Sequence, residues 1–230
     1  MGEDTRRSFH QQLDEIQADL LRLGALVQEA LARGTEVLLN GDLRDAQALI
    51  DGDDVLDEIA LDVEDRCFHL LATQQPMASD LRALVTAIRL SSEIERSGDL
   101  MVNVVKGARR IYGSTIDPRT RGLIQQLSEE AGRLYARAMD AYAEGDAEVA
   151  AALDDMDDVL DELHRDYIAQ ILEASRLGQL DVPAAVQLAL IGRYYERIGD
   201  HAVNVGERVH YMVTGSLHDP VDLPDAGASA

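Results

Sequence analysis

Two stretches of this chain carry carboxylates and an amide at the same spacing. Residues 95–104 read ERSGDLMVNV and residues 196–205 read ERIGDHAVNV, so the shared residues recur 101 positions apart. In a helix, residues four apart lie along one ridge, and the acid, acid and amide of each motif follow that interval. Carboxylate and amide oxygens are the ligands that hard metal cations prefer. The predicted metal ligands in the two motifs are Glu95, Asp99, Asn103, Glu196, Asp200 and Asn204.

A second set of acids precedes each motif. Residues 53–59 (DDVLDEI) match residues 157–163 (DDVLDEL) at an offset of 104. Each block places two aspartates one helical turn apart beside an apolar stripe, and we add these four as candidate ligands: Asp53, Asp57, Asp157 and Asp161. Two helices that present such pairs to one groove could hold one ion or a small cluster. Oxygen ligation suits magnesium, calcium, manganese or oxidised iron, and zinc usually recruits more His or Cys.

The same residues allow a structural interpretation. Glu95 and Glu196 can instead pair with an arginine, for which Arg82, Arg89 and Arg193 are the candidates. Each motif also holds a glycine, which costs about 1 kcal/mol in a helix interior relative to alanine. That cost indicates a close approach there, either of another helix or of a bound ion with its waters. The residues alone leave metal binding and ion pairing open.

The elements that must position these residues form a repeated pattern of helices. Apolar periodicity and capping signals predict six helices near 5–39, 43–73, 77–112, 118–144, 147–176 and 181–214. Short turns join them, so we expect an all-α fold of two tandem three-helix up-down-up bundles. The first repeat covers 1–114 and the second covers 115–215. Residues 216–230 are rich in Pro, Gly and small or acidic residues, which predicts a disordered acidic tail.

Composition narrows the function. The formal net charge of −22 disfavours nucleic acid and anionic lipid as partners and favours metal cations and basic protein faces. One cysteine excludes an internal disulfide. The first residues do not resemble a signal peptide, and no apolar run reaches the roughly 18 residues that a membrane span needs. We therefore expect a cytoplasmic protein without membrane insertion.

The combined motifs resemble the PhoU family of regulators of phosphate uptake and signalling. The resemblance rests on residues 74–82 (QQPMASDLR), followed by the motif at 95–99 and its second copy at 196–204, and it extends over most of the chain. It implies two PhoU-type bundles in a cytoplasmic homodimer beside the ATPase subunit of a phosphate ABC transporter and a sensor histidine kinase. The implied role is negative regulation of phosphate uptake and of the phosphate-starvation two-component response. It also implies metal at the ten candidate residues, with iron, zinc, manganese or magnesium as the ion.

Two other function classes compete with this regulatory accessory protein, which would not be an enzyme. A di-iron carboxylate enzyme needs Glu-x-x-His on two helices, and the chain offers it once, at Glu207 and His210. A helical scaffold with ion-paired acids needs no metal at all. If only one repeat binds metal, we expect the second, because it has His201 where the first has Leu100, and Glu207 where the first has Lys106.

Overall fold

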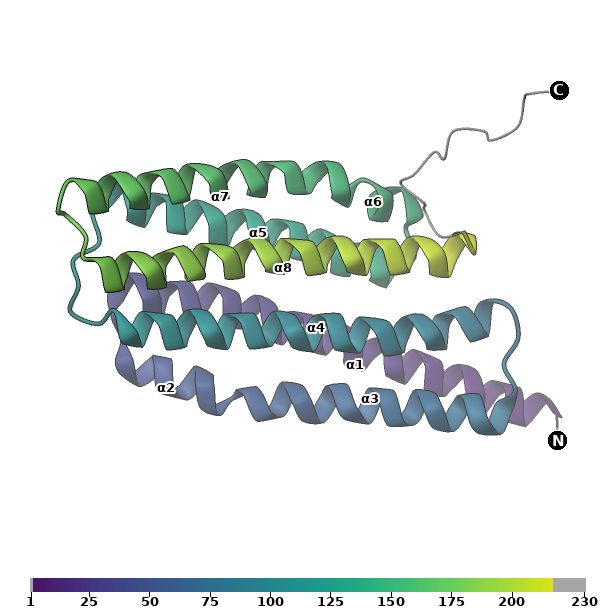
Figure 1. The fold of residues 1–230 in the computed structure, drawn as a ribbon. Helices are drawn as coiled ribbons and strands as arrows, with labels where there is room; N and C mark the ends of the chain where they lie inside the picture. Colours follow the sequence, from purple (N-terminus) through teal and green to yellow (C-terminus); the bar gives the residue numbers. More distant parts are fainter. Residues whose placement is uncertain (1, 217–230) are drawn as a thin grey trace, which may run out of the picture.

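The structure, a computed structural model, describes residues 2–216, and the elements within that range are all helices (Figure 1). Six long helices are α1 (Gly2–Asn40), α3 (Asp53–Gln74), α4 (Ser79–Arg110), α5 (Pro118–Glu144), α7 (Leu153–Arg176) and α8 (Val182–Thr214). Two short helices, α2 (Leu43–Asp51) and α6 (Ala147–Ala151), precede α3 and α7. The all-α prediction is confirmed. The predicted tail lies, from residue 217 onward, outside the described residues.

The long helices form two three-helix bundles that lie side by side. Helices α1, α3 and α4 pack together in one, and α5, α7 and α8 in the other (Figure 1). The bundles meet where α4 lies along α8 and α1 along α5, and one apolar core runs through both. The tandem arrangement is therefore confirmed. Because the core is shared, the domain division at 114/115 stays a prediction from sequence.

Aspartate caps start several helices as their sequence signals predicted. Asp42, Asp117 and Asp146 each accept two hydrogen bonds from backbone N–H groups of the first turn that follows, and Asp181 accepts one. Such caps satisfy donors that a helix start leaves unpaired. The start of α4 has no such cap, because Ala78, with φ of 50°, precedes it and makes no side-chain capping hydrogen bond.

The single helices predicted at 43–73 and 147–176 are wrong, because each is interrupted. The first breaks at Gly52, whose φ of −83° and ψ of −7° keep it close to helical geometry, and its N–H still reaches the Ala48 carbonyl at 3.1 Å. The second breaks at Ala152, whose N–H is shared between the carbonyls of Glu148 and Val149. Glycine is a common cause of such kinks. At the 104-residue offset Ala152 aligns with Ala48, so the second break comes one turn earlier.

A buried hydroxyl cluster ties the two bundles together. The Thr35 hydroxyl lies 2.7 Å from both the Ser128 hydroxyl and the Tyr195 phenol, and it also donates to the Leu31 carbonyl at 2.8 Å. These groups come from α1, α5 and α8, so the cluster spans both repeats. Hydrogen bonding of this kind satisfies polar groups that burial would otherwise penalise. Among the described residues, no helix has both the length and the apolar character to cross a lipid bilayer.

Candidate functional site

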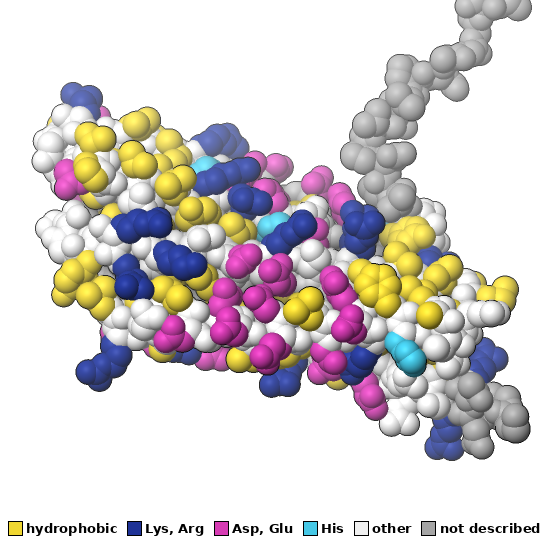
Figure 2. Space-filling view, turned by 60° about the horizontal axis from the view of Figure 1, so that its bottom comes forward, with side chains coloured by type: hydrophobic (Ala, Val, Ile, Leu, Met, Phe, Trp, Pro, Cys, Tyr) yellow, Lys and Arg dark blue, Asp and Glu magenta, His cyan; other side chains and the backbone are white. Residues whose placement is uncertain are grey.

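The first acidic cluster lies in the groove between α3 and α4. It comprises Asp53 and Asp57 on α3 and Glu95 and Asp99 on α4. The charge of Asp99 raises the pKa of the other three, which shows that the four carboxylates lie close enough to repel one another. Figure 2 shows acidic side chains gathered across the middle of the face that carries α3. The structure thus brings together four of the predicted ligands from two helices.

Burial acts on these carboxylates in the same direction as the repulsion. Partial burial is the largest cause of the raised pKa of Asp53, Asp57 and Glu95, followed by the neighbouring carboxylates. Lys106 partly opposes the effect at Asp53, and Arg96 does so at Glu95. Burial and like charges both disfavour the ionised form. A bound cation would relieve both penalties.

The second cluster, between α7 and α8, is buried more deeply. Burial, followed by the charges of Asp200 and Asp161, raises the pKa of Asp157 to about 6. The Oδ1 atom of Asp157 is buried without a hydrogen-bond partner, and so is Oε2 of Glu196. Unsatisfied buried carboxylate oxygens are uncommon because they lose hydration without compensation.

Among the described residues, an arginine forms an ion pair with the second cluster and none does so with the first. Arg193 forms an ion pair with Glu196, one turn away on α8, and its other nitrogen lies 4.0 Å from Asp200. The sequence raised Arg193 as a pairing partner, and the structure has that pair. The residue in register with Arg193 in the first repeat is Ser92. Arg82, another candidate partner, instead donates to the Met212 carbonyl at 3.1 Å.

In the first repeat, a pocket lies at the position that corresponds to Arg193. It has a volume of about 300 Å³ and is lined by Asp57, Ala60, Leu61, Glu64, Ser92 and Glu95. In register with Ala60, the second repeat has His164, a half-buried side chain that sequence analysis missed. Burial, and then the nearby Arg193 charge, lower the pKa of His164, while Asp161 opposes them. The second cluster therefore has larger side chains where the first has open space.

The two predicted asparagine ligands lie in different surroundings. Asn103 is half-buried on α4, one turn beyond Asp99. Asn204 donates to Oε2 of Glu93 at 3.2 Å, and Nδ1 of His201 lies 2.6 Å from the same oxygen. This contact crosses from α8 to α4. Glu93 was missed because its counterpart in the second repeat is Tyr194, so it leaves no mark in the repeat.

The motif glycines are explained by close helix packing. A Cβ on Gly98 would lie 2.9 Å from Cδ1 of Leu56, and one on Gly199 would lie 2.4 Å from Cδ2 of Leu160 and 2.6 Å from Oδ1 of Asp157. Of the two explanations predicted for these glycines, the approach of another helix therefore holds at both. Each glycine lets the aspartate-bearing helix of its repeat lie against α4 or α8.

The carboxylates of the two acidic clusters are chemically suited to bind a cation, but their positions do not form a complete coordination site. Carboxylates with raised pKa values and two orphaned oxygens are the groups that a metal ion would satisfy. Yet over residues 2–216 no three His, Cys, Asp or Glu side chains converge as a ready-made ligand set. The acids thus have the right chemistry for metal, and side-chain rotation would be needed to complete a coordination shell.

Known proteins share this sequence and this fold. Residues 20–108 and 124–209 match the family model described as PhoU domain. A Mycobacterium leprae protein named phosphate-specific transport system accessory protein PhoU homolog 1 is 36% identical over 95% of this chain and 98% of its own length. A Mycobacterium tuberculosis protein named PhoU homolog 2 is 35% identical over 92% of this chain and 99% of its own.

Solved structures agree. The crystal structure of the phosphate transport system regulatory protein PhoU from Streptococcus pneumoniae superposes with a TM-score of 0.84 at 26% identity, covering 92% of this chain and 99% of the other. The two matched segments each take in one acidic cluster and the motif helix that carries half of it. The chain belongs to the PhoU domain family.

Proposed function

We propose that this protein is an accessory regulator of a phosphate-specific transport system. The observation that carries the proposal is the near-complete coverage, in both directions, between this chain and relatives named as accessory proteins of that system. In detail, it restrains phosphate uptake and holds off the phosphate-starvation two-component response. It works in the cytoplasm through contacts with the transporter ATPase subunit and a sensor histidine kinase, without catalysing a reaction.

The surface chemistry supports a role in binding. Acidic side chains gather in the middle of one face (Figure 2), where burial and then the neighbouring carboxylates raise the pKa values of Asp53, Asp57 and Glu95. Such a field attracts basic protein faces and cations. An ATPase subunit or kinase that presents Lys and Arg to this face would relieve the repulsion among the acids.

The acidic clusters are also the proposed metal sites. Asp53, Asp57, Glu95 and Asp99 would hold the ion in the first repeat, with Asn103 adjacent. Asp157, Asp161, Glu196 and Asp200 would hold it in the second, with Asn204 adjacent. When bound, an iron, zinc, manganese or magnesium ion supplies the positive charge that these carboxylates lack. The role of the protein side chains is to hold the two helices of each groove at a fixed separation.

Ion pairing is the competing explanation, and one contact favours it in the second repeat. Arg193 already places a positive charge on Glu196 there, whereas Ser92 leaves Glu95 without that charge. This contact weakens the expectation that the second repeat is the preferred metal site. In the scaffold alternative, the acids of both repeats serve structure alone.

Homodimer formation is part of the proposal. Val182, Val186 and Leu190 are exposed at intervals of four along α8, with 68%, 51% and 42% of their surfaces accessible. A stripe of this kind is suited to burial against a second chain. Val186→Asp should shift the protein to monomer in light scattering coupled to size exclusion if α8 forms the interface.

Metal binding and the regulatory role are tested in separate experiments. Metal is measured by mass spectrometry on tag-free protein, beside a variant in which Glu95, Asp99, Glu196 and Asp200 are all alanine. We expect near-stoichiometric metal that the variant loses while it keeps its helicity. Absence of metal from the wild type, with a less stable variant, would support the scaffold. A phosphate-starvation reporter in cells lacking the gene tests regulation: unchanged reporter output on deletion would contradict it.

A further inference from the structure

The first repeat has an apolar pocket beside its acidic cluster. The pocket lies between α1, the α2–α3 junction and α4, and its volume is about 210 Å³. Its walls are mainly aliphatic and include Leu26, Leu49, Val55, Met101, Val102 and Val105. Asp53 and Gly98 also line it, so the pocket and the first acidic cluster share a border.

The pocket exists because of a residue that the second repeat does not share. Gly52, at the break between α2 and α3, lines it and has no side chain to fill it. At the 104-residue offset the second repeat has Met156 at this position, and Met156 packs against the core. The counterpart of Leu49 is the identical residue Leu153, but Leu153 is fully buried, with Cδ1 2.5 Å from where a Cβ on Gly206 would stand. At the position of Gly52 the second repeat thus places a side chain where the first leaves space.

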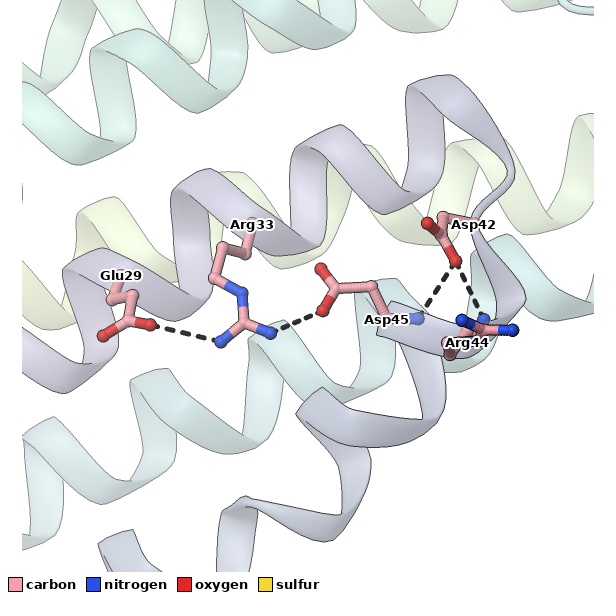
Figure 3. Close-up of polar contacts among 5 residues, drawn as sticks. All are labelled: Glu29, Arg33, Asp42, Arg44 and Asp45. Carbon is pink, nitrogen blue, oxygen red and sulfur yellow. Dashed lines mark hydrogen bonds and ion pairs between the residues drawn. The ribbon is translucent and has the colours of Figure 1, made fainter.

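The rim of the pocket is negative. Its one arginine, Arg33, is held by Oε1 of Glu29 at 3.1 Å and by Oδ1 of Asp45 at 2.5 Å (Figure 3). Asp45 is itself fixed, because it lies in the first turn of α2, whose N–H groups Asp42 caps. Arg33 is therefore already neutralised by two carboxylates, and Asp53 continues into the acidic cluster with Asp57 and Asp99. A ligand therefore binds this pocket best if it places an apolar group inside the pocket and a positive charge at the acidic rim.

We propose that this pocket docks a bulky aliphatic or aromatic side chain of a partner protein, from a segment in which Lys or Arg stands next to that side chain. The apolar side chain enters between α1, α2–α3 and α4, and the basic residue meets the first acidic cluster. The inference rests on the proposed function only in that the protein acts through partner contacts. It makes the two repeats unequal: the first docks the segment and the second does not.

A phage-displayed library of random dodecapeptides, selected on the full-length protein, tests this inference. We expect selected peptides to share a Leu, Met or Phe adjacent to Lys or Arg. Two variants fill the pocket with residues of the second repeat: Gly52→Met and Ala30→Leu, which copy Met156 and Leu134. Each should weaken a selected peptide by about tenfold or more. Gly122→Met is the matched control, because the space around Gly122 is open.

The charge is tested separately with Asp53→Asn, which should weaken the same peptides and reduce the salt dependence of their binding. Circular dichroism checks that each variant is folded. If one of the two pocket-filling variants does not fold, the other still tests the pocket. Selection without this motif, or selected peptides that bind the filled variants as well as the wild type, would overturn the inference. That outcome leaves the phosphate-starvation reporter result, and hence the proposed function, untouched.

Discussion

Nδ1 of His201 on α8 lies 2.6 Å from Oε2 of Glu93 on α4, and this contact joins the two repeats across their shared seam. Asn204 donates to the same oxygen at 3.2 Å. Burial alone would raise the pKa of Glu93, but the hydrogen bonds from His201 and Asn204 outweigh it, and the pKa lies below its ordinary value. Glu93 is therefore a charged group held between the helices that unite the bundles.

Removing this charge should loosen the α4–α8 seam. We expect Glu93→Gln to lower the free energy of unfolding by about 1–2 kcal/mol, because His201 and Asn204 lose their charged acceptor. Urea unfolding near neutral pH measures the loss, and exposed Glu144→Gln is the control. Since the folded-state pKa of Glu93 is lowered, its contribution is present above the unfolded value and disappears as the pH falls through the folded one.

A double-mutant cycle tests whether the pair is coupled. His201→Leu installs the residue that the first repeat has at this position, Leu100. The combined variant should lose less than the sum of the two single losses, because each single change removes the same contact. Strictly additive losses would show that Glu93 and His201 contribute independently.

Most of the candidate site residues could be predicted from the sequence because they recur in both repeats. Glu95, Asp99, Asp53 and Asp57 were found because duplication kept them in register, and the structure groups them in one groove. Glu93 escaped, since its residue type does not recur in the other copy, and His201 was noted only as an extra potential ligand of the second repeat, not as a partner of Glu93. Their meeting depends on how α4 lies along α8, which periodicity within one helix does not reveal. The break at Ala152 was missed because alanine favours helix; the α6–α7 junction lies against α8, where a Cβ on Gly206 would stand 2.7 Å from the Ala150 carbonyl oxygen.

Arg193 and Ser92 should control how the two acidic clusters bind cations. Ser92→Arg places in the first cluster the charge that the second already has, so it should reduce the rise in Tm that manganese produces. Arg193→Ser should increase that rise by opening the second cluster. In metal-free protein Arg193→Ser should cost about 1–3 kcal/mol, because Glu196 is buried and loses its partner. Differential scanning fluorimetry with and without manganese gives both readouts.

The control for this exchange is Arg197→Ser, a change to an exposed residue on the same helix. It removes an equal charge without touching the Glu196 pair. An Arg193→Ser variant that behaves like Arg197→Ser with manganese would mean that Arg193 does not compete with a cation.

The two motif glycines should differ in their tolerance of a methyl group. Gly199→Ala meets both Leu160 and Asp157 at 2.6 Å or less, and we expect a cost of about 1–3 kcal/mol. Gly98→Ala meets only the end of the Leu56 side chain at 2.9 Å, which can move, so its cost should be smaller. Gly122→Ala, in open space on α5, should instead stabilise by about 0.5–1 kcal/mol. Equal costs at 98 and 199 in chemical denaturation would contradict the packing difference.

Asp157 gives a prediction whose sign depends on pH and on metal. Its pKa is raised from 3.8 to about 6, so the folded state favours the protonated form. Stability from this group is complete below the unfolded value and is lost as the pH rises through the folded one. In metal-free protein, Asp157→Asn should therefore stabilise near neutral pH and gain little near pH 4. Because the carboxylate is only half-buried and solvent screens it, we expect a gain of about 1 kcal/mol.

A bound cation should reverse that sign. Manganese favours the ionised carboxylate, so if Asp157 is a ligand it should stabilise the wild type more than Asp157→Asn, which keeps only the response of the first cluster. Exposed Asp158→Asn, next to it on α7, is the control for a loss of charge alone. A variant that is more stable without metal but less responsive to it would identify Asp157 as a group whose native charge needs a cation. If Asp157→Asn is more stable than the wild type both without and with manganese, Asp157 is not a metal ligand.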